Sequence, residues 1–191
     1  MLDNGSGMSL KIVHLASTIE ESDDFHIARL LLLLKASSGR SDKPVQGIMK
    51  LAKLDFLLRY PNCLVRVLQE LGKEDAAKEI PEEERDTIEA RMIRFRFGPW
   101  DKRYRRWIGI LISKRLANTY VEGRTVNVKL TQEGIELASR LSELEDFRSL
   151  SKRSQVVAST VGGYSATKLK DFIYKVFPEI VSMQWGRHID L

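Results

Sequence analysis

The stretch TYVEGRTVNVKLTQEG, residues 119–134, decides the fold that we expect for this chain. Apolar and polar residues alternate in its VNVKL segment, and Glu122 and Gly123 supply a tight turn before it, so the stretch predicts a β-hairpin, or wing, over residues 119–131. Thr131 is a good helix N-cap, so a further helix is expected to begin at LTQEG.

The segment before the hairpin, residues 101–117, has the spacing of an amphipathic helix that Asp101 can cap. Its apolar residues recur at i, i+3, i+4 and i+7 and are expected in the core: Tyr104, Trp107, Ile108 and Leu111. Its bases project to the opposite side: Lys102, Arg103, Arg105 and Arg106. A helix, a hairpin and a capped helix start, in this order, are typical of the closing half of a winged helix.

Two strongly apolar helices are expected nearer the N-terminus. HIARLLLLLK, residues 26–35, is apolar on almost every side, which predicts a core helix with Asp23 or Asp24 as its cap. A second helix is expected over residues 42–60, with Pro44 in its first turn, where a missing amide costs nothing.

A shorter helix over residues 63–72 and a strand over residues 91–97 complete this half of the chain. The strand, RMIRFRF, is expected to serve as the additional β element of the winged helix. The fold class is therefore α+β and mostly α-helical: a winged-helix domain with additional packing helices and a C-terminal helical extension. The expected segments are residues 1–19, in which MLDNGSG is typical of an expression scar or a frayed end, residues 20–148 and residues 149–191.

The C-terminal extension carries an apolar stripe. A polar helix over residues 150–161 is followed by Gly162 and Gly163, and Ser165 is expected to cap a last helix. The stripe on that helix consists of Leu169, Phe172, Ile173 and Val176. Such a stripe must be covered, either by the chain's own domain or by a partner protein, and in the second case these four residues bind the partner.

The net charge of +5 is distributed unevenly. Residues 73–89, the acidic segment, carry eight acids against three bases, and residues 91–115 carry nine bases against one acid. Either the two runs neutralise each other or are solvated, or the basic run binds a polyanion. In the second case the candidate nucleic-acid-binding residues are Lys102, Arg103, Arg105, Arg106, Arg124 and Lys129.

The chain lacks the common patterns of catalytic and metal sites. It has no GxxxxGK[ST] loop for a nucleotide, and His14, His26 and His188 lack the spacing of a metal site. Cys63 is the single cysteine and is expected to be a small buried residue. We therefore expect no enzyme activity, cofactor or metal. The longest apolar run, residues 30–34, is too short for a membrane span, so the expected location is cytoplasmic, without a membrane partner.

A resemblance to the middle component of bacterial three-component ABC-ATPase systems is carried by HIARLLLLLKASSG, GIMKLAKLDFLLRYP, RFRFGPWDKRYRRWIGILISKRL, LTQEG and KLKDFIYKVFPEI. Within that family the chain is most similar to the accessory subunit of Lamassu-type defence against phage and plasmids. The similarity covers most of residues 20–180, through short and mainly hydrophobic motifs. It implies a winged-helix adaptor that assembles with an SMC-like or Rad50-like coiled-coil ATPase and an effector nuclease. ATP hydrolysis and DNA cleavage would then belong to the partners.

Two hypotheses follow for the function. In the first, the chain is a non-enzymatic adaptor in such a complex, and its basic face contacts the double-stranded DNA that the complex holds. In the second, it is a free-standing winged-helix transcriptional regulator, which requires sequence preference and usually a two-fold dimer. A face made almost entirely of Arg and Lys positions a protein on DNA and does not read bases, which favours the first hypothesis.

Overall fold

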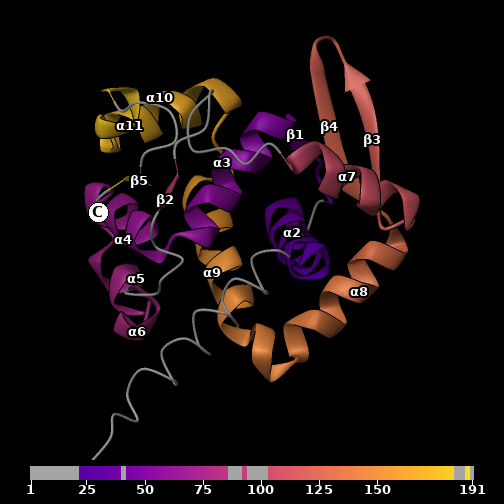
Figure 1. The fold of residues 1–191 in the computed structure, drawn as a ribbon, viewed down its shortest axis with the longest axis horizontal. Coiled ribbons are helices and arrows are strands. Elements are labelled where there is room, and N and C mark those ends of the chain that lie inside the picture. Colours follow the sequence, from indigo (N-terminus) through magenta and orange to yellow (C-terminus); the bar gives the residue numbers. More distant parts are fainter. Residues whose placement is uncertain (1–21, 40–41, 86–91, 94–102, 183–187, 190–191) are drawn as a thin grey trace, which may run out of the picture.

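A computed structural model describes residues 22–39, 42–85, 92–93, 103–182 and 188–189. The described part is mostly helical, with a small three-stranded antiparallel sheet, as the α+β prediction required. Helix α2 (Asp23–Ser38) lies in the middle and is surrounded by the other elements (Figure 1). Its five consecutive leucines, residues 30–34, are each at most 3% exposed, because a helix that is apolar on all sides is stable only when it is covered on all sides.

The N-terminus of α2 differs from the prediction in one detail. Ser22 is the N-cap, and its hydroxyl accepts a hydrogen bond from the Phe25 amide at 3.4 Å. Asp23 and Asp24, which were expected to cap, lie in the first helical turn, where carboxylates stabilise the helix dipole. Asp23 has contacts with a distant helix, which are described below.

The predicted single helix over residues 42–60 is wrong in its first turn. Strand β1 (Val45–Gln46) precedes helix α3 (Ile48–Arg59). Gly47 separates them with a φ of +105°, which a side-chain-bearing residue rarely adopts, and its amide donates to the Val126 carbonyl at 3.1 Å. The segment that follows Pro44 is therefore extended because a strand far along the sequence pairs with it.

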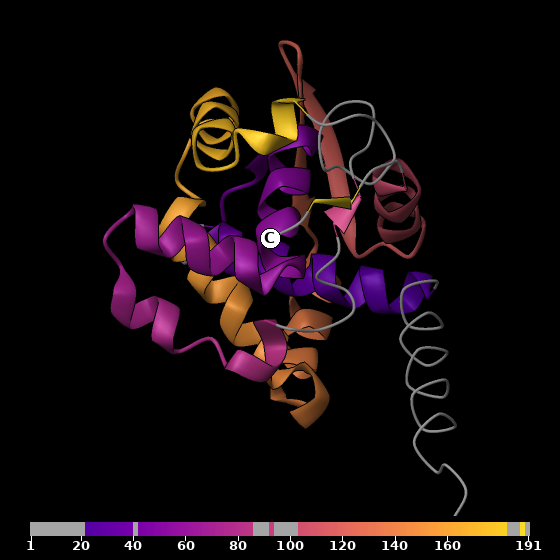
Figure 2. The same cartoon turned by 60° about the vertical axis from the view of Figure 1, so that its left-hand side comes forward.

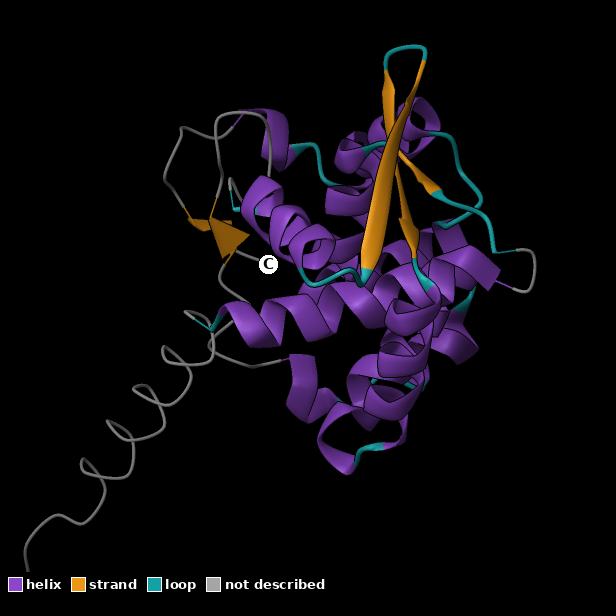
Figure 3. Cartoon of the chain, turned by 90° about the vertical axis from the view of Figure 1, so that its right-hand side faces the viewer, coloured by secondary structure: helices purple, strands orange, loops and turns teal. Residues whose placement is uncertain are grey.

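The predicted hairpin is confirmed. Strands β3 (Ala117–Glu122) and β4 (Thr125–Leu130) pair in register, with Glu122 opposite Thr125 across a two-residue turn. Strand β1 adds to the other side of β4, with Val45 opposite Val128, so the sheet order is β1-β4-β3. The hairpin extends beyond the helices (Figure 3).

The additional β element of this sheet is β1 and not the predicted strand at 91–97. Within that range the structure describes β2 (Met92–Ile93), which pairs with β5 (His188–Ile189) in a separate two-stranded sheet. Residue 91 and residues 94–97 lie outside the described residues.

Helices α7 (Tyr104–Ser113) and α8 (Gln132–Glu143) flank the hairpin. Helix α7 ends four residues before the predicted end near residue 117, and Asp101, its expected cap, lies outside the described residues. The predicted cap of α8 is confirmed, because the Thr131 hydroxyl accepts from the Gly134 amide at 3.0 Å. The same hydroxyl donates to the Arg115 carbonyl at 2.7 Å, which ties the end of α7 to the start of α8.

Among the described residues between α3 and α7, three helices follow α3: α4 (Pro61–Glu70), α5 (Glu74–Lys78) and α6 (Glu82–Arg85). Pro61 starts α4 in addition to ending α3, and Gly72, with a φ of +64°, follows its end as predicted. The acidic segment forms the two short helices α5 and α6 over its described part.

The described residues of the C-terminal part form α9 (Glu145–Val161), α10 (Ala166–Val176), α11 (Glu179–Ser182) and the strand β5. Helix α9 packs along α2 and α3, while α10 packs on α3 and α4, and Figure 2 shows α10 above α4. Ser165 caps α10 as predicted, accepting from the Lys168 amide at 3.1 Å. No helix in the described part of the chain is long and apolar enough to cross a membrane.

We predict that Gly134→Ala destabilises the protein. A Cβ at this position would overlap the carbonyl of Leu116, because the first turn of α8 packs directly on the backbone that leaves α7. Overpacking of this kind costs about 1–3 kcal/mol, to be measured as a loss in the free energy of unfolding in urea. The control is Gly109→Ala in the middle of α7, where the new Cβ would meet no atom within 4 Å apart from its chain neighbours and the backbone of its own helix. It should be neutral or stabilising by about 1 kcal/mol. Equal effects of the two substitutions would contradict the prediction.

Candidate nucleic-acid interface

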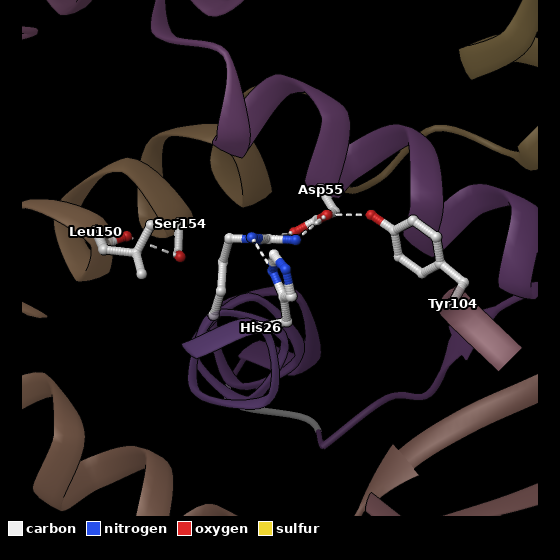
Figure 4. Close-up of polar contacts among 6 residues, drawn as sticks. His26, Asp55, Tyr104, Leu150 and Ser154 are labelled. Atoms are coloured by element: carbon white, nitrogen blue, oxygen red, sulfur yellow. Dashed lines mark hydrogen bonds and ion pairs between the residues drawn. The ribbon is translucent and has the colours of Figure 1, made fainter. Parts of the chain in front are cut away.

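A buried ion pair holds the helices that carry the candidate interface. Arg29 of α2 and Asp55 of α3 are each 1% exposed, and two hydrogen bonds join them, from Nε to Oδ1 at 2.6 Å and from Nη2 to Oδ2 at 2.9 Å. The Tyr104 hydroxyl of α7 donates to the same Oδ2 (Figure 4). Burial, and then the Asp55 charge, raise the pKa of Tyr104 well above its usual value, so the hydroxyl stays protonated and remains a donor.

Trp107 completes the attachment of α7. It is fully buried, its ring centroid lies 4.2 Å from that of His26, and its Nε1 donates to Asp23 Oδ1 at 3.0 Å. His26 Nδ1 accepts from Arg29 Nη1 at 2.8 Å, so Nδ1 carries no proton, because an arginine can only donate. The prediction that Tyr104, Trp107, Ile108 and Leu111 face the core is therefore confirmed. Residues of α2 and α3 therefore fix the rotation of α7 about its axis.

The bases predicted on the opposite face of α7 have different surroundings. Arg105 is exposed. Arg106 is also exposed but forms an ion pair with Asp23 at 2.5 Å, and Arg103 is partly buried, with its guanidinium 5.0 Å from the Trp107 ring centroid. Lys102 lies outside the described residues.

The two predicted residues of the hairpin also differ. Arg124 is exposed in the two-residue turn. Lys129 forms an ion pair with Asp42 at 2.6 Å, between β4 and the segment that leads to β1. Because Asp42 partly neutralises it, Lys129 is a weaker candidate for phosphate binding than Arg124.

Two further bases belong to this surface and were not among the candidates. Lys114 and Arg115 follow the last turn of α7 and are exposed, and neither has an ion-pair partner among the described residues. The Leu116 amide donates to the Leu111 carbonyl at 2.8 Å, which closes the helix, and Arg115 has a left-handed φ of +57°. Sequence reasoning missed them because glycine or asparagine normally marks such a helix end, and none is present here.

The described part of the acidic segment does not cover this surface. Glu84 binds Arg153 of α9 by an ion pair and accepts a hydrogen bond from Ser149 on the same helix. Asp75 pairs with Lys78 within α5, at 2.9 Å. The bases at the end of α7 and in the hairpin turn are therefore not neutralised by α5 or by Glu84.

The apolar stripe of α10 is covered by the chain itself. Leu169 and Ile173 are fully buried, Val176 is 6% exposed, and Phe172 is partly buried against Tyr164 at a centroid distance of 5.8 Å. Of the two covers considered, the chain's own helices α3 and α4 are the one found. The prediction that these residues bind a partner is therefore wrong for the folded chain, because three of the four are buried in its core.

The structure also shows the surroundings of Cys63 and of possible metal ligands. Cys63 is buried, and burial raises the pKa of its thiol, which keeps the sulfur protonated and unreactive. Among the described residues, no group of three or more His, Cys, Asp or Glu side chains is arranged to hold a metal ion.

No protein-family model, curated protein or solved structure matches the chain.

We predict that Asp55→Asn strongly destabilises the protein. The substitution keeps the size of the side chain but leaves the Arg29 guanidinium buried without its carboxylate, which costs about 3–5 kcal/mol in the free energy of unfolding. Tyr104→Phe, which removes one hydrogen bond to the carboxylate, should cost about 1–3 kcal/mol. Asp75→Asn on α5 is the matched control, since it removes an exposed carboxylate and should hardly change the denaturation midpoint. A small effect of Asp55→Asn in urea unfolding would refute the central role of the pair.

Proposed function

We propose that this chain is a non-enzymatic winged-helix adaptor that contacts the phosphate backbone of duplex DNA through the end of α7 and the hairpin turn. The interface consists of four exposed bases: Arg105, Lys114, Arg115 and Arg124. None of them has an ion-pair partner among the described residues. The association of the chain with an SMC-like or Rad50-like ATPase and an effector nuclease is inferred from the family resemblance of the sequence.

The order of the elements supports the winged-helix assignment. Helix α2, strand β1, helix α3, helix α7 and the hairpin β3–β4 follow one another along the chain, and β1 pairs with the second strand of the hairpin. This is the order of a winged helix, with α7 in the position of the recognition helix and the hairpin as the wing. Helices α4 to α6 are then an insertion between its second and third helices.

Arg115 is the observation that carries the proposal. A left-handed backbone costs an arginine about 1 kcal/mol relative to glycine, which is the usual residue at this position after a helix. Backbone conformations of this kind in residues other than glycine cluster at functional sites. Arg115 directly follows Lys114 in the sequence, at the end of the proposed recognition helix.

The surroundings of these bases favour binding to any phosphate backbone. Within residues 103–124 the only acid is Glu122, which accepts a hydrogen bond from Asn127 at 3.3 Å. The exposed face of α7 carries Gly109, Ile112 and Ser113 beside its bases, and of these three only Ser113 could hydrogen-bond a base edge. Such a surface holds DNA without reading its sequence, which suits an adaptor better than a free-standing regulator.

We predict that Arg115→Gly makes the protein more stable but a weaker DNA binder. Glycine relieves the left-handed strain, so the free energy of unfolding should rise by about 1 kcal/mol. Loss of one phosphate contact should lower the slope of log affinity against log salt by about 0.9, measured by fluorescence anisotropy on a duplex of random sequence. Replacing Arg105 and Lys114 by Gln as well should lower it by about 2.7 in total.

The matched control for this experiment is Arg148→Gln. Arg148 is exposed on α9, paired with Glu145 at 2.6 Å, and its removal changes the net charge by the same amount. If this variant lowers the salt slope as much as Arg115→Gly does, binding depends only on net charge and the interface is elsewhere. A scrambled duplex should bind as well as a genomic one, and a clear preference would favour the regulator.

The adaptor role has its own test. We predict that the tagged chain, recovered from its native host after nuclease treatment, brings down a large coiled-coil ATPase and an effector, identified by mass spectrometry. Nuclease treatment removes proteins joined only through DNA. Recovery of the chain alone would contradict the adaptor role and leave the DNA interface to be explained by the regulator hypothesis.

A further inference from the structure

An open pocket of about 590 Å³ lies beside the proposed wing, next to the pairing of β1 with β4, and no residue of α7 lines it. Its size falls within the range of about 300–1,000 Å³ that small-molecule sites occupy. Strands β1 and β4, the hairpin turn and the first residues of α3 and α10 form its walls. Its lining includes two bases and one acid, Lys50, Arg124 and Glu122, together with Gly47, Asn127 and Ala166.

Two helices begin at this pocket. The N-cap of α3 is Gly47, which has no side chain to accept from the amides of the first turn. On α10 the Ser165 hydroxyl accepts from Lys168, and Ala166, the first residue of the helix, lines the pocket. The positive ends of two helix dipoles, of 12 and 11 residues, therefore meet at one place, which favours an anion.

Lys50 is the second and independent observation. The residue is 9% exposed and lines the pocket, and its ammonium group, which reaches solvent, has no hydrogen-bond or ion-pair partner among the described residues. An anion can therefore approach it from the pocket, and a cation that has lost part of its hydration favours such a counter-ion. Burial lowers the pKa of Lys50.

Asn127 adds an unpartnered acceptor. The side chain is 1% exposed, and its Nδ2 donates to Glu122 Oε2 at 3.3 Å, but its Oδ1 has no hydrogen-bond partner. Such a buried acceptor requires a donor, and an anion alone does not supply one. A ligand that satisfies both Lys50 and Asn127 must carry an anionic group and a hydroxyl or amino group.

A neighbouring pocket of about 620 Å³ shares Gln46 and Lys50 but has the opposite polarity. It is lined by Ser37 and Gly39 at the C-terminal end of α2 and by Gly162 and Gly163 after α9. The negative ends of two helix dipoles disfavour an anion there. The anion therefore belongs on the side of Lys50 where α3 and α10 begin.

We propose that the pocket at the starts of α3 and α10 binds a small phosphomonoester that also carries a hydroxyl or amino group. Its phosphate lies at the two helix N-termini beside Lys50 and Arg124, and its hydroxyl or amino group donates to Asn127 Oδ1. This site overlaps the proposed DNA interface at Arg124, so its test uses Lys50, which is not part of that interface.

The experiment is a calorimetric titration with inorganic phosphate, ribose 5-phosphate and ribose, at constant ionic strength. We expect ribose 5-phosphate to bind with a stoichiometry of one and more tightly than inorganic phosphate, and ribose not to bind. Lys50→Met keeps an apolar chain of similar length and should weaken both phosphates at least tenfold. Lys50→Gln serves as a second variant should the first fold poorly, as judged by circular dichroism.

Lys53→Met is the matched control. Lys53 lies one turn further along α3 and is 5% exposed, but its ammonium donates to the Met49 carbonyl at 3.1 Å, and it does not line the pocket. Its replacement should leave phosphate binding unchanged. The proposal fails if the parent protein binds neither phosphate, or if Lys53→Met weakens binding as much as Lys50→Met does. If the protein binds duplex DNA but neither phosphate, the proposed pocket site is wrong and the proposed function stands.

Discussion

The ion pair between Arg29 and Asp55 is the interaction on which the rest of the structure depends. It lies in an apolar core where neither charge can be solvated, so the two helices that supply it can pack only in the register that joins them. Tyr104 uses a free position on the same carboxylate, which brings a third helix to the pair. A purely apolar contact would allow α7 to turn about its axis. This arrangement does not, and the bases after its last turn therefore have a defined direction.

The distribution of charge follows from this arrangement. Arg106 forms an ion pair with an acidic side chain near the N-terminus of α2, and Lys129 forms one with an acidic side chain before β1. Glu84 forms an ion pair with Arg153. Lys114 and Arg115 at the end of α7 and Arg124 in the hairpin turn have no ion-pair partner among the described residues, a property that they share with Arg140 on α8 and Lys152 on α9. Residues 103–124 contain one acid, Glu122, so this part of the chain is locally positive although the net charge is modest. Lys50 is a different case, since the residue is largely buried and lines a pocket.

Local signals in the sequence were sufficient for the elements whose stability is local. The hairpin, the Thr131 cap and the buried face of α7 follow from alternation, capping chemistry and helical spacing, and all three were predicted correctly. The wrong predictions of the β elements share a cause, which is pairing between segments far apart in the sequence. Strand β1 depends on Val128, which lies 83 positions after its partner Val45, and a single sequence does not reveal that pairing.

The candidate site was predictable in part for the same reason. The excess of arginine and lysine before the hairpin is visible in the composition, but whether each base meets an acid depends on tertiary contacts such as that between Arg106 and Asp23. Arg115 was missed because its backbone conformation is set by the closure of α7 onto α8 and not by its own preference. The Arg29–Asp55 pair was missed because charged residues in a helical pattern usually face solvent.

The central position of α2 has a consequence for synthesis of the chain. Its leucines leave the ribosome before α8 and α9, which pack against it and are completed only at residues 143 and 161. This strongly apolar helix therefore stays partly uncovered until α9 has been synthesised, so the core closes late. Chains that stop before α9 would expose that helix to chaperones, to proteases and to one another.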